Sequence, residues 1–95
     1  MAQVIWTTRA TNELANTATY LEDYSVTYAT SFVRKVYDRV GQLATFPEMG
    51  RVIPEINRDT YRELLEGNYR IMYELLDDIV LIQQIVHQAR NFENS

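Results

Sequence analysis

The chain has 95 residues, of which 46% are apolar, and a formal net charge of −4. This length predicts a single domain over residues 1–95, near the lower end of the sizes that fold on one hydrophobic core. The absence of cysteine excludes disulfides and cysteine-based zinc sites, and a single histidine argues against other zinc sites. We expect neither metal nor cofactor.

The start of the chain lacks the basic residues and long apolar stretch of a signal peptide, and its longest apolar run is only a few residues. These features predict a soluble, cytoplasmic protein with no membrane partner. Residues 1–59 carry six basic and seven acidic side chains, a balance of −1, and residues 60–95 carry three and six, a balance of −3. Surfaces that bind phosphates usually cluster positive charge, and neither half has such an excess.

The first half of the chain predicts one strand and two helices. Residues 3–7 are β-branched and aromatic, which favours a strand that joins the sheet. Thr8 is a candidate N-cap for an amphipathic helix that runs to the break at Tyr24-Ser25. Ser25 can cap a second helix over residues 26–45, which Pro47 closes. A short break between two helices predicts an antiparallel hairpin.

The segment between the second helix and residue 60 has weaker signals. Residues 46–51, Phe-Pro-Glu-Met-Gly-Arg, have the composition of a turn. Residues 52–59 show no clean period, and Pro54 argues against a central strand. This stretch is therefore expected to be irregular or to hold a short edge strand.

Residues 60–92 predict three antiparallel strands with two-residue turns at Gly67-Asn68 and Asp77-Asp78. The turns place Leu64 opposite Ile71, Tyr73 opposite Ile82, and Arg70 opposite Ile85. Because side chains alternate along a strand, the sheet has a core face and a second face. The predicted core face holds Leu64, Tyr69, Ile71, Tyr73, Leu75, Val80, Ile82, Gln84 and Val86. The second face holds Tyr61, Glu63, Leu65, Arg70, Met72, Glu74, Ile79, Leu81, Gln83, Ile85 and His87.

The second face mixes charged, polar and apolar groups, so it is where we expect function. The complete order, β-α-α-β-β-β, predicts an α+β fold in which a helical hairpin packs on an antiparallel sheet.

Four segments in order resemble one family. They are residues 46–51 (Phe-Pro-Glu-Met-Gly-Arg), 61–64 (Tyr-Arg-Glu-Leu), 67–73 (Gly-Asn-Tyr-Arg-Ile-Met-Tyr) and 85–92 (Ile-Val-His-Gln-Ala-Arg-Asn-Phe). This pattern is similar to the RelE/ParE superfamily of toxins from bacterial type II toxin–antitoxin modules, and the resemblance covers essentially the whole chain. It implies a toxin that inhibits growth and is neutralised by a small antitoxin.

The RelE branch of the superfamily cleaves messenger RNA on the ribosome. The resemblance places Arg70 and Arg90 on two functional arginines of that branch, whereas its paired lysines fall near Tyr61 and Glu63, neither of which is basic. Related ribosome-dependent enzymes use His and Glu with Arg. A nuclease would therefore use Arg70, His87, Arg90 and Glu63 as its catalytic candidates.

The ParE branch poisons DNA gyrase by binding, and this is the interpretation that we favour, because it needs no lysine pair and suits an acidic chain. A third alternative is an inactive relative that only binds its antitoxin. As part of the complex with its antitoxin, such a relative would bind promoter DNA.

Each candidate also has a structural interpretation. Arg70 near Glu63 and Glu74 can form an ordinary cross-strand ion pair. His87 can be a half-exposed structural histidine at a strand end, and Arg90 a solvated residue beyond the last strand.

The resemblance makes the cognate antitoxin the most direct partner. An amphipathic antitoxin segment could dock as a helix in a groove or as an added strand. We expect apolar residues of the second helix, represented by Phe32 and Val40, to form part of the contact.

Overall fold

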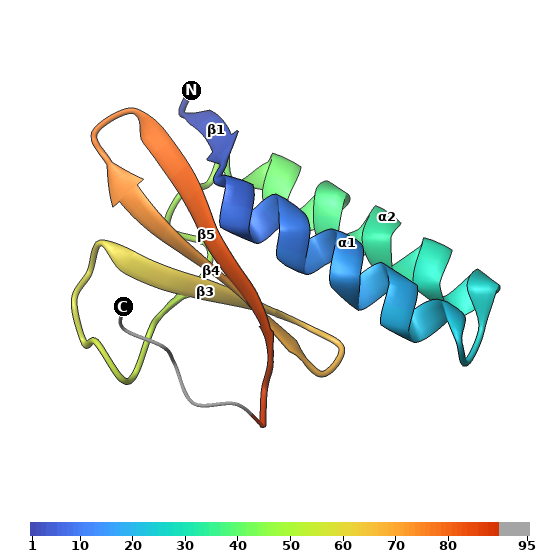
Figure 1. Cartoon of the computed structure of the whole chain (residues 1–95). Coiled ribbons are helices and arrows are strands. Elements are labelled where there is room, and N and C mark those ends of the chain that lie inside the picture. The colour runs from blue at the N-terminus through green and yellow to red at the C-terminus, as the bar shows by residue number, and fades with distance from the viewer. Residues whose placement is uncertain (90–95) are drawn as a thin grey trace.

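The structure is a computed structural model that describes residues 1–89. Two helices lie side by side against one face of a five-stranded sheet, with strand order β1-β5-β4-β3-β2 (Figure 1). The bounds of the elements are β1 Gln3–Trp6, α1 Thr8–Glu22, α2 Val26–Gln42, β2 Arg51–Val52, β3 Tyr61–Glu66, β4 Tyr69–Leu76 and β5 Ile79–His87. The predicted order is confirmed, and the unpatterned stretch contributes the two-residue edge strand β2. Strand β1 joins the sheet parallel to β5, so the sheet is mixed.

Both helices begin at side-chain caps. The Thr7 hydroxyl accepts a hydrogen bond from the N–H of Ala10, so α1 begins one residue earlier than predicted. The Ser25 hydroxyl accepts from the N–H of Tyr28, as predicted for α2. Helix α2 ends at Gln42, and the following residues form turns before Pro47. The helical hairpin is confirmed.

The main core lies between the hairpin and one face of the sheet. Helix α1 contributes Ala10, Leu14 and Leu21, which are all buried. The other buried members of this core are Ala29, Phe32, Val36, Val40, Leu43, Leu64, Ile71, Tyr73, Val80, Ile82 and Ile85. Burial of this apolar surface is the main driving force for folding.

The two tight turns have the predicted positions. Gly67 has a φ of 57°, a left-handed conformation that glycine adopts without a steric penalty. Asp77 has a φ of 52°, which aspartate tolerates better than most residues. As predicted, β3 pairs with β4 through Leu64 and Ile71, and β4 pairs with β5 from Tyr73–Ile82 to Leu76–Ile79.

The predicted register of β4 and β5 is wrong where residues 69–72 of β4 pair with residues 84–87 of β5. The pairing shifts between Met72 and Tyr73, so that Arg70 lies opposite Val86 and not Ile85. A β-bulge adds one residue to one strand, which moves the following side chains to the other face. Four predicted face assignments are therefore reversed, those of Gln84, Ile85, Val86 and His87.

The turn after α2 is fixed by its contacts to the sheet. The Tyr73 hydroxyl donates to the carbonyl of Pro47 over 2.7 Å and accepts from the N–H of Gly50 over 2.9 Å. A Cβ atom on Gly50 would lie 2.6 Å from the carbonyl oxygen of Glu63, so this close approach requires glycine. Within the part of the chain that the structure describes, no helix has the length and hydropathy needed to cross a membrane.

Candidate functional site

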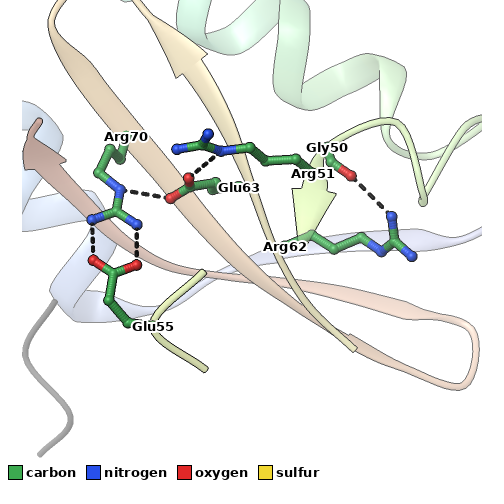
Figure 2. Close-up of polar contacts among 6 residues, drawn as sticks. All are labelled: Gly50, Arg51, Glu55, Arg62, Glu63 and Arg70. Atoms are coloured by element: carbon green, nitrogen blue, oxygen red, sulfur yellow. Dashed lines mark hydrogen bonds and ion pairs between the residues drawn. The ribbon is translucent and has the colours of Figure 1, made fainter. Parts of the chain in front are cut away.

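The second face of the sheet holds a network of four charged side chains (Figure 2). The Glu63 carboxylate on β3 accepts hydrogen bonds from Nε of Arg70 and from Nε of Arg51, each over 2.6 Å. The two terminal nitrogens of Arg70 donate to the two carboxylate oxygens of Glu55, each over 2.7 Å. Two glutamates therefore bind Arg70 at all three of its guanidinium nitrogens.

The central pair of this network, Glu63 and Arg70, is buried. The side chain of Glu63 is 0% exposed and that of Arg70 is 7% exposed, whereas those of Glu55 and Arg51 are 41% and 56% exposed. The hydrogen bonds from Arg70 lower the pKa of Glu55 to about 2. The bonds to Glu55 and Glu63 raise the pKa of Arg70 above its already high value. Both groups stay charged at neutral pH, and their charges neutralise each other locally.

A short strap, residues 53–57, brings Glu55 to the network. The N–H of Ile53 donates to the carbonyl of Tyr61, and the N–H of Asn57 closes the turn on the carbonyl of Ile53. The apolar side of the strap packs on the sheet in a small second core of Ile53, Ile56, Tyr61, Met72 and Val86. Burial of these side chains and the two hydrogen bonds to Arg70 hold the strap against the second face.

The structure brings together only two of the four catalytic candidates. Arg70 and Glu63 meet directly, but both are buried and bound to each other. The bulge moves His87 to the helix-covered side of the sheet, opposite Tyr69, so it does not join Arg70. The predicted grouping of Glu63, Arg70 and His87 on one face is therefore wrong. Arg90 lies outside the described residues.

His87 lines a different feature, a recess of about 710 Å³ between α1 and the end of β5. Its exposed imidazole packs edge-on against the ring of Tyr69, with 5.2 Å between the ring centroids. The other residues that line the recess are Glu13, Asn16, Thr17, Tyr20, Ile85, Val86 and Ala89. Among the described residues, no group of three or more acidic or histidine side chains could hold a metal ion.

The two apolar residues expected to contact an antitoxin are not on the surface. Phe32 and Val40 are 3% and 1% exposed, and both pack in the main core between α2 and the sheet. The helical spacing correctly marks them as one face of α2, but that face covers the sheet. The expectation that these two side chains face a partner is therefore wrong for the toxin by itself. Aspartate at either position would disrupt folding, so it could not report on antitoxin binding alone.

Two members of the network, Arg51 and Glu55, are not predicted by the sequence. Glu55 lies in the stretch without a clean period, and no local pattern links it to Arg70 fifteen residues later. Glu63 and Arg70 were found because the Gly67-Asn68 turn places them near each other on one face. Arg51 meets Glu63 because β2 pairs with β3 at these two residues, and Glu55 meets Arg70 only when the strap is folded over the sheet.

Comparison with known proteins identifies the family. Residues 4–92 match the family model described as the ParE toxin of the type II toxin–antitoxin system, parDE. The chain belongs to this family. Its members are toxins that act with an antitoxin partner, so the resemblance seen in the four sequence segments is confirmed at the level of the RelE/ParE superfamily.

Two relatives of this ParE-family chain are informative. Toxin RelE2 from Caulobacter vibrioides is 35% identical over 91 residues, which cover 95% of this chain and 99% of the relative. A chain of the chromosomal ParDE toxin–antitoxin system from P. aeruginosa superposes with a TM-score of 0.72 at 18% identity, covering 92% of this chain and 96% of the other. At that identity the second similarity shows the shared fold.

Proposed function

We propose that this toxin inhibits growth in the cytoplasm by binding and poisoning DNA gyrase, without catalysing a reaction of its own. Its membership in a family of type II toxins is shown, whereas the choice between gyrase and messenger RNA is our inference. The observation that carries the proposal is the state of Arg70. Its side chain is 7% exposed, and each of its three guanidinium nitrogens donates a hydrogen bond to Glu55 or Glu63.

Cleavage of RNA next to a ribose 2′-hydroxyl needs a positive group at the scissile phosphate and a base and an acid nearby. Arg70 is poorly placed for the first role in this conformation, because its buried guanidinium is already bound by two carboxylates. A phosphate approaching it would also meet the negative charge of Glu55. The positions near the lysine pair of the RelE pattern carry Tyr61 and Glu63, and neither supplies positive charge.

The nearest alternative is a ribosome-dependent endoribonuclease. Two observations favour it: the name of the Caulobacter relative, Toxin RelE2, and the exposed His87, which lines the same recess as Glu13. It would have to use the recess and not the Arg70 network. An inactive relative that only binds its antitoxin is the third possibility, and it predicts no growth arrest.

The test uses purified, antitoxin-free toxin in two parallel assays. The first measures gyrase supercoiling and trapped cleavage complexes, and the second measures messenger cleavage in a translating extract. We expect gyrase inhibition and intact messenger, and we expect the same result for His87→Ala, because this exposed side chain can be removed without opening the core. Cleavage of messenger by the wild type, lost in His87→Ala, would overturn the proposal.

A further inference from the structure

The outer edge of β5 is paired with another strand along only half of its length. Strand β1 pairs with residues Ile79 to Ile82 and stops there, because α1 begins at Thr8. From Gln83 to His87, α1 runs beside β5 and no strand of the described residues lies next to its outer edge. At about 3.3 Å per residue, this open segment is about 16 Å long.

Two side chains occupy the place of a neighbouring strand at the start of this segment. The Thr7 hydroxyl lies 2.9 Å from the carbonyl oxygen of Ile82 and 3.4 Å from that of Gln83. The carboxylate of Glu13, on α1, accepts a hydrogen bond of 2.8 Å from the N–H of Ile85. The second oxygen of Glu13 is 3.3 Å from Nε of Arg9. In a paired strand, a backbone carbonyl would accept the hydrogen bond from Ile85.

The direction of the backbone groups follows from these contacts. The N–H of Gln88 donates to the carbonyl of Asn68, so Gln88 forms a hydrogen-bonded pair across β4 and β5. Inter-strand hydrogen bonds alternate along an antiparallel pair, which turns the backbone groups of Val86 inward to β4 and those of Ile85 and His87 outward. The bond from Ile85 to Glu13 agrees with this alternation.

The recess beside the open edge has the shape and chemistry for an extended peptide. Asn16 and Thr17 on α1 offer polar side chains along it, and Tyr20, Tyr69 and His87 form its aromatic end. Another extended backbone can pair with the row of backbone groups along a strand edge, and this is how sheet-augmenting peptides bind. Since Glu13 gives the recess a negative group and the chain carries a net charge of −4, a neutral or basic segment fits it best.

We propose that the outer edge of β5 from Gln83 to His87 receives an extended segment of the antitoxin as an additional strand, and that Glu13 holds the place of this strand in the free toxin. In the complex, a carbonyl of the antitoxin takes the N–H of Ile85, and the carboxylate of Glu13 keeps Arg9 as its partner. The inference rests on the antitoxin partner in the proposed function and is independent of gyrase as the target.

The first test uses peptides of about 12 residues tiled across the cognate antitoxin, with binding to the full toxin measured by calorimetry. The peptide that binds most tightly is then made in two forms, N-methylated at the odd or at the even residues of its core. A strand that adds to an edge uses the N–H groups of only one of its own two edges. We expect one form to lose roughly tenfold or more in affinity and the other to bind as before.

Equal loss in both forms, or equal tolerance, would overturn strand addition. An antitoxin segment that binds as a helix gives equal loss, because N-methylation at either parity removes helical hydrogen bonds.

The second test asks whether Glu13 protects the edge. Open sheet edges favour self-association. We expect Glu13→Ala to self-associate at a concentration roughly tenfold below that of the wild type in sedimentation experiments, and the bound peptide to reverse this. The matched control is Glu22→Ala, which removes an exposed glutamate from the same helix away from the recess.

Circular dichroism establishes that both variants fold. A folded Glu13→Ala variant that stays as monomeric as Glu22→Ala would contradict the role given to Glu13. Neither test depends on a gyrase assay, so their failure and the failure of the gyrase proposal are distinguishable.

Discussion

The two faces of the sheet are covered in different ways. The helical hairpin covers one face with an apolar core, in which residues such as Ile71 and Ile82 are fully buried. The strap covers the other face with a small apolar cluster and four charged side chains, of which Glu63 is as deeply buried as the core. A buried charge is tolerated only when it is paired, so the second face depends on complete ion pairs where the first depends on packing.

This difference bears directly on function. Arg70 occupies a position that the family resemblance links to catalysis, but here it joins β3, β4 and the strap by hydrogen bonds to Glu63 and Glu55. A residue type at a motif position does not define its role. The role depends on accessibility and partners: Arg70 is buried, and all three of its guanidinium nitrogens already bind carboxylates.

The largest expected effect comes from removing one member of the buried pair. Arg70→Gln leaves the Glu63 carboxylate buried with only the half-exposed Arg51, and breaking such a pair typically costs about 3–5 kcal/mol. Chemical denaturation measures the loss in the free energy of unfolding. The matched control, Arg51→Gln, removes the exposed partner and should cost about 0–1 kcal/mol. Equal effects of the two substitutions would contradict the arrangement.

A second prediction concerns the turn that joins α2 to the second face. Gly50→Ala places a methyl group against the carbonyl of Glu63 and the hydroxyl of Tyr73, both within 2.7 Å, and should destabilise the fold by about 1–3 kcal/mol. Gly41→Ala, in α2, meets no atom within 4 Å and should stabilise the helix by up to about 1 kcal/mol. The midpoint of thermal unfolding should therefore move in opposite directions for the same chemical change.

The strap should make stability depend on pH in the acidic range. The pKa of Glu55 falls from 4.5 to about 2 on folding, so its carboxylate stabilises the folded state above about pH 4.5. This contribution is lost as the pH falls from 4.5 towards 2. Denaturation of the wild type and of Glu55→Gln at pH 6 and pH 3 measures it, and the difference between the two proteins should shrink at pH 3. A constant difference would show that Glu55 is not held by Arg70.

The smallest expected effect is that of His87→Ala on folding. The imidazole is exposed and contacts the ring of Tyr69 from one side, so its removal should change the free energy of unfolding by less than about 1 kcal/mol. A larger loss would mean that the recess contributes to the stability of β5. This comparison also shows whether His87→Ala is a fair probe in the two activity assays.

The sequence predicted most of the fold because its signals were local. Ser25 marks the start of α2, and the Gly67-Asn68 turn sets the pairing of β3 with β4. The register shift between Met72 and Tyr73 was not predictable in this way, because no glycine or proline in the paired segments marks the bulge. That single extra residue separates His87 from Arg70.

The candidate site was predicted less completely than the fold. Glu63 and Arg70 share a face by strand alternation, which is a property of the sequence. Their burial, and the contact with Glu55, depend on where the strap lies, and an aperiodic segment gives no information about this. Hydrophobic periodicity correctly placed Phe32 and Val40 on one side of α2. It could not tell a side that covers the sheet from a side that meets a partner.

The most direct test of the account is a double-mutant cycle on Glu63 and Arg70, with growth arrest as its second readout. Arg70→Gln should cost about 3–5 kcal/mol, and Glu63→Gln should cost less, because Arg70 keeps its two hydrogen bonds to Glu55. The double variant Glu63→Gln with Arg70→Gln should be more stable than Arg70→Gln alone, because the buried Glu63 charge is then also removed. We predict that the double variant arrests growth and traps gyrase cleavage complexes like the wild type. A double variant that folds and binds its antitoxin but no longer arrests growth would contradict a structural role for Arg70.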